Sequence, residues 1–375
     1  MKIGFDAKRA YQNFTGLGNY SRDLIEHLIK EYSDNEYFLF APKDSENSRL
    51  DFLSNYDNTY SIFPQNKLNK TFKGLWRTIN MEKSIIKNDV DIFHGLSNEI
   101  PRVKNKKIPY VVTIHDLIFK RFPRNYRSID RKIYNIKYKY AVKHADLTIA
   151  ISEQTKQDIV EFYKIKPESI KVIYQTCHEN FRKEYSKEDI DFTKKKFNLP
   201  KDFMLNVGTI ETRKNLISII NAMSIMKMDV PLVVVGKKTQ YMNFLKIQMK
   251  KMNFESKKII FLENVSIDEL PIIYSLSSLF LYPSLFEGFG IPILEALNCK
   301  TPVISSKGSC FQEAGGDFSK YIDSENREEF AFQIEECLTN NKLRESMIIE
   351  GVKHAENFQP NKISKKLIDV YESLV

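Results

Sequence analysis

Glu287 and Glu295 flank a break in the apolar pattern, in the segment EGFGIPILEA. The preceding run LFLYPS predicts a buried strand, LFEGFG a loop, and Pro292 suits the first position of a following helix. Glu295 is then expected in the first helical turn and Glu287 in the loop, where Gly288 and Gly290 let the backbone approach a ligand. Carboxylates accept hydrogen bonds from vicinal hydroxyls, so the pattern favours a sugar or a ribose. For Glu295 alone, pairing with the helix dipole is the alternative.

Two adjacent cations form a second candidate site. Arg213 and Lys214 follow the apolar run FMLNVG, and Asn215 stands where it would cap the next helix. Two positive charges at a strand-to-helix turn suit a diphosphate, because they neutralise the charge that builds on a leaving group. The alternative is a solvated basic pair without a ligand.

Two further loops carry residues suited to ligand binding. After the first apolar run, Gly16 and Gly18 predict a tight turn before a helix whose N-terminal amides suit a phosphate, with an ordinary turn as the alternative. No third glycine completes a dinucleotide fingerprint, which disfavours a nicotinamide enzyme. His115 and Asp116 end the run VVTIHD and could orient a reacting group. His94 ends another run with weaker support, and a lone histidine is usually structural.

Short apolar runs alternate with segments of helical period in both halves of the chain. The runs are KIGFD, YFLFAP, DIFHG, YVVTIHD and LTIAIS, then FMLNVGT, PLVVVGK, KIIFLE, LFLYPS and TPVISS. Such alternation predicts an α/β fold, with parallel sheets and helices on both faces. Periodicity lapses over 174–192, so we expect two doubly wound domains with ligands beyond the carboxyl ends of their strands.

The positive charge of the chain is unevenly distributed. Its 375 residues carry a net charge of +9, and residues 1–180 hold 30 Lys and Arg against 22 Asp and Glu. The excess gathers in 67–87 and in 121–144, where tyrosines interleave with the cations. Besides a solvated helix face, this pattern favours an anionic partner such as phospholipid head groups or a lipid diphosphate. No nucleic-acid recognition motif accompanies the charge.

The sequence predicts no metal site, disulfide or membrane span. The four cysteines lack CxxC spacing and are expected to be reduced, and the six histidines lack HxxxH or HExxH spacing. The pairs Asp89–Asp91 and Asp189–Asp191 resemble the solvated ends of elements more than magnesium–diphosphate sites. No apolar run reaches the roughly 20 residues of a span, and the first residues lack a signal-peptide block, so we expect a cytoplasmic protein.

Taken together, these segments resemble the retaining GT-B glycosyltransferases of family four, also called group 1 glycosyltransferases. VGTIETRKNL, YPSLFEGFGIPILEAL, TPVISSKGSCFQEAGGD and VVTIHD match the family's motifs in order. The resemblance covers most of the chain and is firmest over 200–325. It implies a GT-B architecture of two Rossmann-like domains facing across a cleft. Residues 1–180 would form the acceptor side and 181–358 the donor side, with a helix over 359–375 crossing back to the first domain.

The resemblance also implies roles for individual residues. Glu287 would bond hydroxyls of the donor sugar, and Glu295 the ribose of its nucleotide. Lys214, helped by Arg213, would hold the diphosphate as it leaves, and His115 would lie near the reacting centre. The remaining donor-binding positions would be Gly16, Gly18, Asp116, Phe289, Gly290 and Ile291.

The same resemblance implies a metal-independent, retaining enzyme that takes a nucleotide-diphosphate sugar as substrate and needs no cofactor. Many members carry an arginine where this chain has Thr209, which shifts the cationic role to Arg213 and Lys214. The motifs are similar to those of bacterial surface-polysaccharide mannosyltransferases. They favour GDP-mannose slightly, with UDP-sugars next, and a glycan or lipid-diphosphate-linked acceptor. The basic first half agrees with such an acceptor and with peripheral attachment to the inner face of the membrane.

Two other functions stay open at the level of sequence. A GT-B sugar-nucleotide epimerase would share the nucleotide site and would convert its substrate without an acceptor. A basic membrane- or nucleic-acid-binding protein without activity would bind in a strongly salt-dependent way and would not need Glu287 or Lys214. A glycoside hydrolase also uses two carboxylates, but it has no use for cations beside them.

Overall fold

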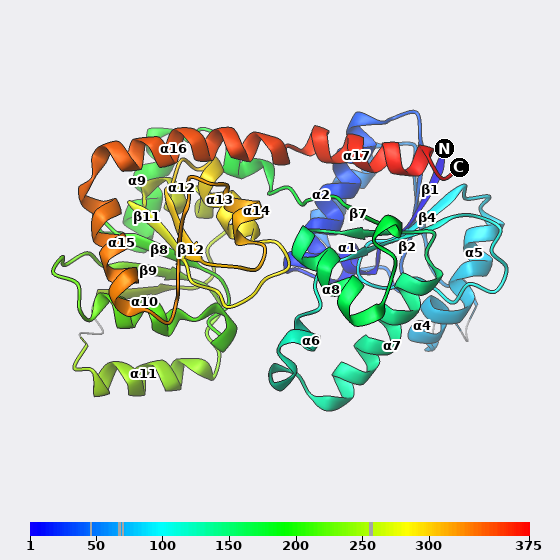
Figure 1. The fold of residues 1–375 in the computed structure, drawn as a ribbon. Helices are drawn as coiled ribbons and strands as arrows, with labels where there is room; N and C mark the ends of the chain where they lie inside the picture. The colour runs from blue at the N-terminus through cyan, green and yellow to red at the C-terminus, as the bar shows by residue number, and fades with distance from the viewer. Residues whose placement is uncertain (46, 67–68, 70, 255–257) are drawn as a thin grey trace. The chain divides into compact units, whose positions relative to one another are not determined.

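The chain forms two compact units in a computed structural model that describes residues 1–45, 47–66, 69, 71–254 and 258–375 (Figure 1). Unit 1 comprises Met1–Thr176 together with Phe358–Val375, and unit 2 comprises Cys177–Asn357. Each unit has its own sheet and its own hydrophobic core.

The sheet of unit 1 is parallel and contains seven strands among the described residues, in the order β3-β2-β1-β4-β5-β6-β7. Adjacent residues of one strand face opposite layers, so Tyr37 and Leu39 belong to one core and Phe38 and Phe40 to the other. The strands are β1 (Lys2–Asp6), β2 (Glu36–Phe40), β3 (Thr59–Ile62), β4 (Ile92–Gly95), β5 (Tyr110–Ile114), β6 (Leu147–Ala150) and β7 (Ile170–Val172).

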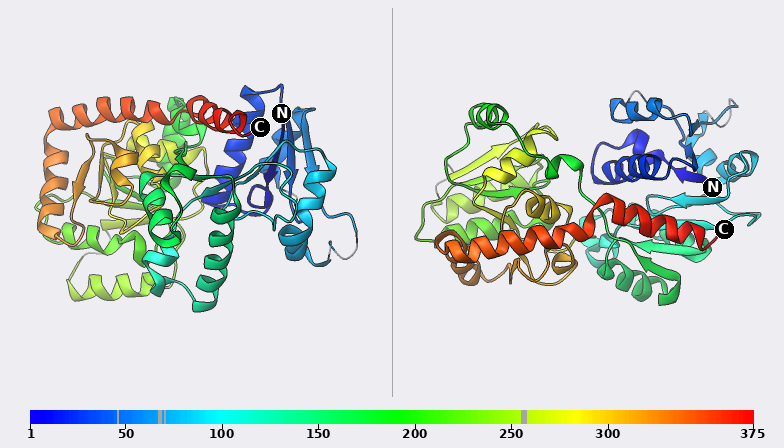
Figure 2. Two further views of the ribbon diagram at one scale, coloured as in Figure 1. Left: turned by 45° about the vertical axis from the view of Figure 1, so that its right-hand side comes forward. Right: turned by 90° about the horizontal axis from the view of Figure 1, so that it is seen from above.

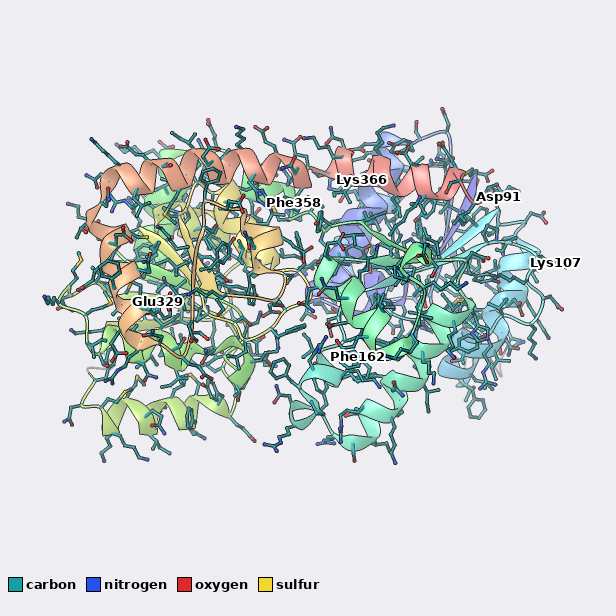
Figure 3. The ribbon with its side chains drawn as sticks, in the orientation of Figure 1. Asp91, Lys107, Phe162, Glu329, Phe358 and Lys366 are labelled. Carbon is teal, nitrogen blue, oxygen red and sulfur yellow. The ribbon has the colours of Figure 1, made fainter. Side chains whose placement is uncertain are left out.

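Helices cover both faces of this sheet. They are α1 (Lys8–Gln12), α2 (Gly16–Glu31), α4 (Lys73–Leu75), α5 (Met81–Lys87), α6 (Ile118–Arg121), α7 (Ser128–His144), α8 (Glu153–Tyr163) and α17 (Pro360–Glu372). The last helix, α17, lies beside α2, as the two views of Figure 2 also show. Its Ile363 and Leu367 are buried in the core that Leu24 and Leu28 of α2 also enter. Lys366 of α17 is exposed (Figure 3).

The sheet of unit 2 repeats this design with six described strands in the order β10-β9-β8-β11-β12-β13. The strands are β8 (Met204–Val207), β9 (Leu232–Val235), β10 (Ile259–Leu262), β11 (Leu279–Tyr282), β12 (Val303–Ser306) and β13 (Lys320–Ile322). The helices are α9 (Lys187–Phe197), α10 (Leu216–Met223), α11 (Tyr241–Lys251), α12 (Glu269–Leu276), α13 (Ile291–Asn298), α14 (Phe311–Gly315), α15 (Arg327–Thr339) and α16 (Asn341–Ala355). The predicted α/β fold with two doubly wound parallel sheets is therefore confirmed.

Candidate active site

The central loops of unit 2 meet where its strand order reverses. β8 and β11 are neighbours, but the chain continues from β8 towards β9 on one side and from β11 towards β12 on the other. In open α/β sheets, ligands bind at this switch point beyond the carboxyl ends of the strands. The two loops are bonded together, since the Leu285 amide donates to the Arg213 carbonyl at 2.9 Å, and the Ser284 hydroxyl oxygen lies 3.2 Å from the same carbonyl.

The carboxylate of Glu287 is the centre of a polar cluster at this point. Its Oε1 lies 2.6 Å from Arg213 Nη1 and 2.6 Å from Lys214 Nζ, and it accepts a 2.6 Å hydrogen bond from Ser284 Oγ. Lys214 Nζ also donates to the Tyr282 hydroxyl at 2.8 Å. The structure thus brings the two predicted cations and the predicted loop carboxylate together within one unit.

The cluster is held out of water and stays ionised. The Glu287 side chain is 11% exposed, and those of Arg213 and Lys214 are 16% and 15% exposed. Burial alone would raise the pKa of Glu287, but the charges of Lys214 and Arg213 outweigh it and lower the pKa to about 2. Arg213 is fixed further by hydrogen bonds to the Phe286 carbonyl at 2.8 Å and to Glu211 at 2.7 Å.

A glycine with an unusual backbone conformation starts the helix after Glu287. Gly290 is the N-cap of α13 and has φ +109°. A residue with a side chain would be strained in this backbone conformation. The helix begins at Ile291, so Pro292 is its second residue where the sequence predicted the first. Glu295 is therefore the fifth residue of α13 and lies in its second turn. The sequence placed it in the first turn, because it predicted that the helix begins one residue later, at Pro292.

Glu295 has a different environment from Glu287. Its Oε2 accepts a 3.0 Å hydrogen bond from the Tyr274 hydroxyl of α12. Burial raises the pKa of Glu295 to about 7, an effect that the Tyr274 bond and the more distant Lys214 charge reduce. The two glutamates therefore differ in protonation, since Glu287 is ionised at neutral pH and Glu295 titrates near neutrality.

Three further residues of unit 2 were singled out from the sequence. Thr209, at the position where many family members carry arginine, is exposed. Asn215 is the N-cap of α10, as predicted, but it lies in the left-handed region at φ 55° and its side chain makes no capping bond. Phe289 is buried with 2% of its surface exposed, which leaves its backbone as the part suited to meet a ligand.

The glycine motif of unit 1 lies in a helix where a preceding turn was predicted. Gly16 is the first residue of α2 and Gly18 lies in its first turn, so the predicted turn is wrong. At Gly18 a Cβ would come within 1.9 Å of the Asn13 carbonyl, because the loop from α1 folds back onto the helix there. Gly16 has no atom within 4 Å of such a Cβ, so packing within the protein does not require a glycine at this position.

His115 is buried at the end of β5 with both ring nitrogens bonded. Its Nε2 lies 2.8 Å from the Leu96 carbonyl and its Nδ1 3.1 Å from Gln175 Nε2. The carbonyl can only accept, so Nε2 carries the proton and Nδ1 accepts from the amide. Burial lowers the pKa of His115 to about 4, so the ring is neutral at pH 7. Contact with a donor sugar stays a prediction, and a hydrogen bond from this ring to the sugar would have to replace the one to Leu96.

The other strand-end residues of unit 1 have structural partners. Asp116 Oδ1 accepts from the Ile118 amide at 3.0 Å at the start of α6. His94 is fully buried, with Nδ1 2.6 Å from the Tyr371 hydroxyl of α17 and Nε2 2.8 Å from Thr113 Oγ1. This histidine therefore joins the C-terminal helix to the sheet.

Four residues of the unit 2 cluster were not predicted as site residues. Tyr274, Tyr282 and Ser284 bond the predicted glutamates and lysine, and Glu211 orients Arg213. Tyr282 and Ser284 belong to the run LFLYPS, so two polar residues at the end of an otherwise apolar strand were the available signal.

The two predicted basic stretches differ in the structure. In 67–87, residues 67, 68 and 70 lie outside the described part of the chain, and Arg77 is buried in ion pairs. The stretch 121–144 runs from the last residue of α6 through α7, and nearly all of its residues are exposed or half-buried. Within the described ranges, no three His, Cys, Asp or Glu side chains are grouped as metal ligands would be. Among those same residues, no helix has the length and apolar character of a membrane span.

Comparison with known proteins identifies the family of both halves. The family described as "Glycosyl transferases group 1" matches residues 187–354, and "Glycosyltransferase Family 4" matches residues 14–177. The O-antigen chain mannosyltransferase B of Escherichia coli is 24% identical over 386 residues, covering 100% of both chains. The O-antigen chain mannosyltransferase RfbU of Salmonella typhimurium is 30% identical over 228 residues, covering 60% of this chain and 59% of its own length.

A solved structure agrees with this fold. Alr3699/HepE of Anabaena, solved in complex with UDP and glucose, superposes with a TM-score of 0.75 at 18% identity and covers 100% of both chains. At this identity the likeness supports the fold alone. The matched families and relatives together show that the chain is a group 1 glycosyltransferase of the GT-B type.

Proposed function

We propose that this enzyme transfers a hexose, with retention of anomeric configuration and without a metal, from a nucleotide-diphosphate sugar to a glycan or lipid-linked acceptor in surface-polysaccharide synthesis. GDP-mannose is the favoured donor and a UDP-sugar the next. The relatives named as O-antigen mannosyltransferases support the sugar and the pathway. Retention and metal independence rest on the family resemblance.

The observation that carries the proposal is the pairing of Arg213 and Lys214 with Glu287 at the switch point of unit 2. A buried carboxylate that pairs with two cations keeps them in place without a ligand. When a donor binds, its diphosphate supplies the negative charge and becomes the new partner of the two cations. Glu287 Oε1 is then free to accept from sugar hydroxyls, beside the cations that stabilise the leaving diphosphate.

Glu295 completes the donor site in this proposal. It projects from α13, the helix that Glu287 precedes, and its carboxyl accepts one bond from Tyr274. A carboxylate has room for more than one donor, so the ribose hydroxyls of the nucleotide can bond it at the same time. Because the pKa of Glu295 is raised to about 7, its acceptor capacity grows as the pH rises through neutrality.

Release of GDP from GDP-mannose in EDTA buffer, with a bacterial extract of lipid-linked glycans as acceptor, tests the proposal. We expect Lys214→Gln to lower turnover by at least about 100-fold, which corresponds to roughly 2.7 kcal/mol of lost transition-state stabilisation. Lys238→Gln is the matched control, because Lys238 is also ion-paired in unit 2 but with the surface residue Glu263. Equal turnover in the two variants would refute the assignment, and conversion of the donor without acceptor would indicate an epimerase.

A further inference from the structure

The helix α11 of unit 2 has two opposite faces with different surroundings. Its Met242, Leu245 and Met249 are buried in the hydrophobic core of the unit. The opposite face carries Phe244 and Ile247, which are 43% and 55% exposed. A spacing of three residues makes these two side chains neighbours on the helix surface. The helix, which lies along the lower edge of unit 2 in the view of Figure 1, therefore presents an apolar stripe to solvent.

A tyrosine extends this stripe. The rings of Tyr241 and Phe244 are stacked, with their centroids 5.3 Å apart and an interplanar angle of 21°. Tyr241 is half-buried, so one side of its ring belongs to the outer surface of the helix. Tyrosine combines an apolar ring with a polar hydroxyl, and this combination is favourable at a boundary between water and an apolar phase.

The charged residues around the stripe are all positive. Lys246, Lys250 and Lys251 of α11 are exposed, and residues 231–254, which include the helix and the loop before it, contain no Asp or Glu. The sequence from 181 to 375 is nearly balanced as a whole, with 27 Lys and Arg against 26 Asp and Glu. The positive charge on α11 is therefore a local feature of this half of the chain.

Helix α9 of the same unit has similar residues without this arrangement of charge. Its Phe192 is 64% exposed, and Lys194 beside it is exposed as well. The same helix also carries three acidic residues, Glu188, Asp189 and Asp191. Acidic side chains repel an anionic surface, so α9 lacks the single sign of charge that distinguishes α11.

We propose that α11 is a docking surface for an anionic lipid bilayer. Phe244 and Ile247 enter the boundary between the head groups and the acyl chains, and the three lysines of the helix lie at the level of the lipid phosphates. Charge complementarity and the apolar stripe together favour this partner, because a nucleic acid would neutralise the lysines but leave the stripe in water. The inference goes beyond the proposed function, since it requires neither donor nor acceptor. It also differs from the prediction for 121–144, which concerns unit 1.

Tryptophan fluorescence of the full-length variant Phe244→Trp tests the proposal directly. The protein has one tryptophan of its own, Trp76, which is buried in unit 1. With vesicles of phosphatidylglycerol and phosphatidylcholine, we expect the emission of Phe244→Trp to move to shorter wavelength and to be quenched by brominated acyl chains, because the ring leaves water for the bilayer. Phe192→Trp on α9 is the matched control and should show neither change.

Sedimentation with the same vesicles measures the contribution of each residue to binding. Phe244→Ser should weaken binding by about tenfold, because apolar area is no longer removed from water. Lys250→Gln should weaken it by about fivefold, as expected for one basic residue at an anionic surface. Phe192→Ser and Lys194→Gln, the corresponding changes on α9, should bind as the wild type does. On vesicles of phosphatidylcholine alone, Lys250→Gln and the wild type should bind equally.

Each contrary outcome would overturn the inference in a different way. If the vesicles sediment Phe244→Trp without changing its emission, the membrane contact lies elsewhere on the protein. A shift that is present without vesicles and grows with protein concentration would mean that a second copy covers α11. Equal weakening by the changes on α9 and α11, or no vesicle binding by the wild type, would also contradict it. Calorimetric titration with GDP-mannose tests the proposed function separately, because Phe244→Ser should bind this donor as the wild type does.

Discussion

Replacing Glu287 with glutamine should destabilise the protein by about 3 kcal/mol at pH 7. The pKa of this carboxyl is lowered from 4.5 to about 2, because the Lys214 and Arg213 charges outweigh the effect of burial. Each pKa unit corresponds to about 1.4 kcal/mol, so the ionised form is favoured in the folded state by about 3 kcal/mol. Glutamine keeps the shape and a hydrogen-bonding oxygen but resembles the protonated form. The 11% exposure of the side chain leaves little screening by solvent.

Urea unfolding followed by circular dichroism at several pH values measures this difference. Since the folded-state pKa lies below the unfolded value, the stabilisation is complete above about pH 4.5 and is lost as the pH falls through about 2. The gap between wild type and Glu287→Gln should therefore shrink from about 3 kcal/mol at pH 7 to about half of that at pH 3. Glu350→Gln, which breaks only the 3.8 Å surface pair with Lys353, should cost less than about 1 kcal/mol. A variant as stable as the wild type at pH 7, or a gap that does not change with pH, would refute the reasoning.

Three further changes have defined outcomes. Burial raises the pKa of Glu295 to about 7, so its stabilising protonated form is lost as the pH rises through 7. Glu295→Gln should therefore have a higher melting temperature than the wild type above pH 7, and this gain should vanish below about pH 4.5; a gain that persists there would contradict the assignment. Gly290→Ala should cost about 1–3 kcal/mol in urea unfolding, because φ +109° strains a side chain; an unchanged midpoint would argue against that conformation. Tyr371→Phe should cost about 1–3 kcal/mol in the same assay by leaving the buried Nδ1 of His94 without its partner, and a neutral effect would mean that water replaces the hydroxyl.

The predicted strands lie in the interior of their sheets, with the exception of the edge strand β10. All ten apolar runs contain strands of the structure, whereas β3, β7 and β13 were missed. Each missed strand lies at the edge of its sheet and is only partly buried, with the sequences TYSI, IKV and KYI. An edge strand buries less apolar surface, so it lacks the continuous hydrophobic run that makes a central strand recognisable.

The residue types of the proposed donor site were predictable, but their pairing was not. Arg213, Lys214 and Glu287 were each proposed from local strings, and the sequence offers no signal that both cations bond one oxygen of the glutamate. That contact depends on β8 and β11 being neighbours, which is a tertiary fact. The prediction for Gly16 was wrong for a similar reason. The chain forms the short helix α1 after β1, and α2 then begins at Gly16 itself, so the glycines do not form a separate turn before the helix.

Calorimetric titration of GDP-mannose and UDP-glucose in EDTA, into the wild type, Lys214→Gln and Lys238→Gln, tests the central claim most directly. The claim is that the cluster at the switch point of unit 2 binds the diphosphate of a nucleotide sugar. It predicts that one nucleotide class binds the wild type and Lys238→Gln equally, and binds Lys214→Gln at least about tenfold more weakly, as expected for loss of a charged hydrogen bond. Binding that is unchanged in Lys214→Gln, or the absence of binding by either nucleotide sugar to the wild type, would contradict the claim.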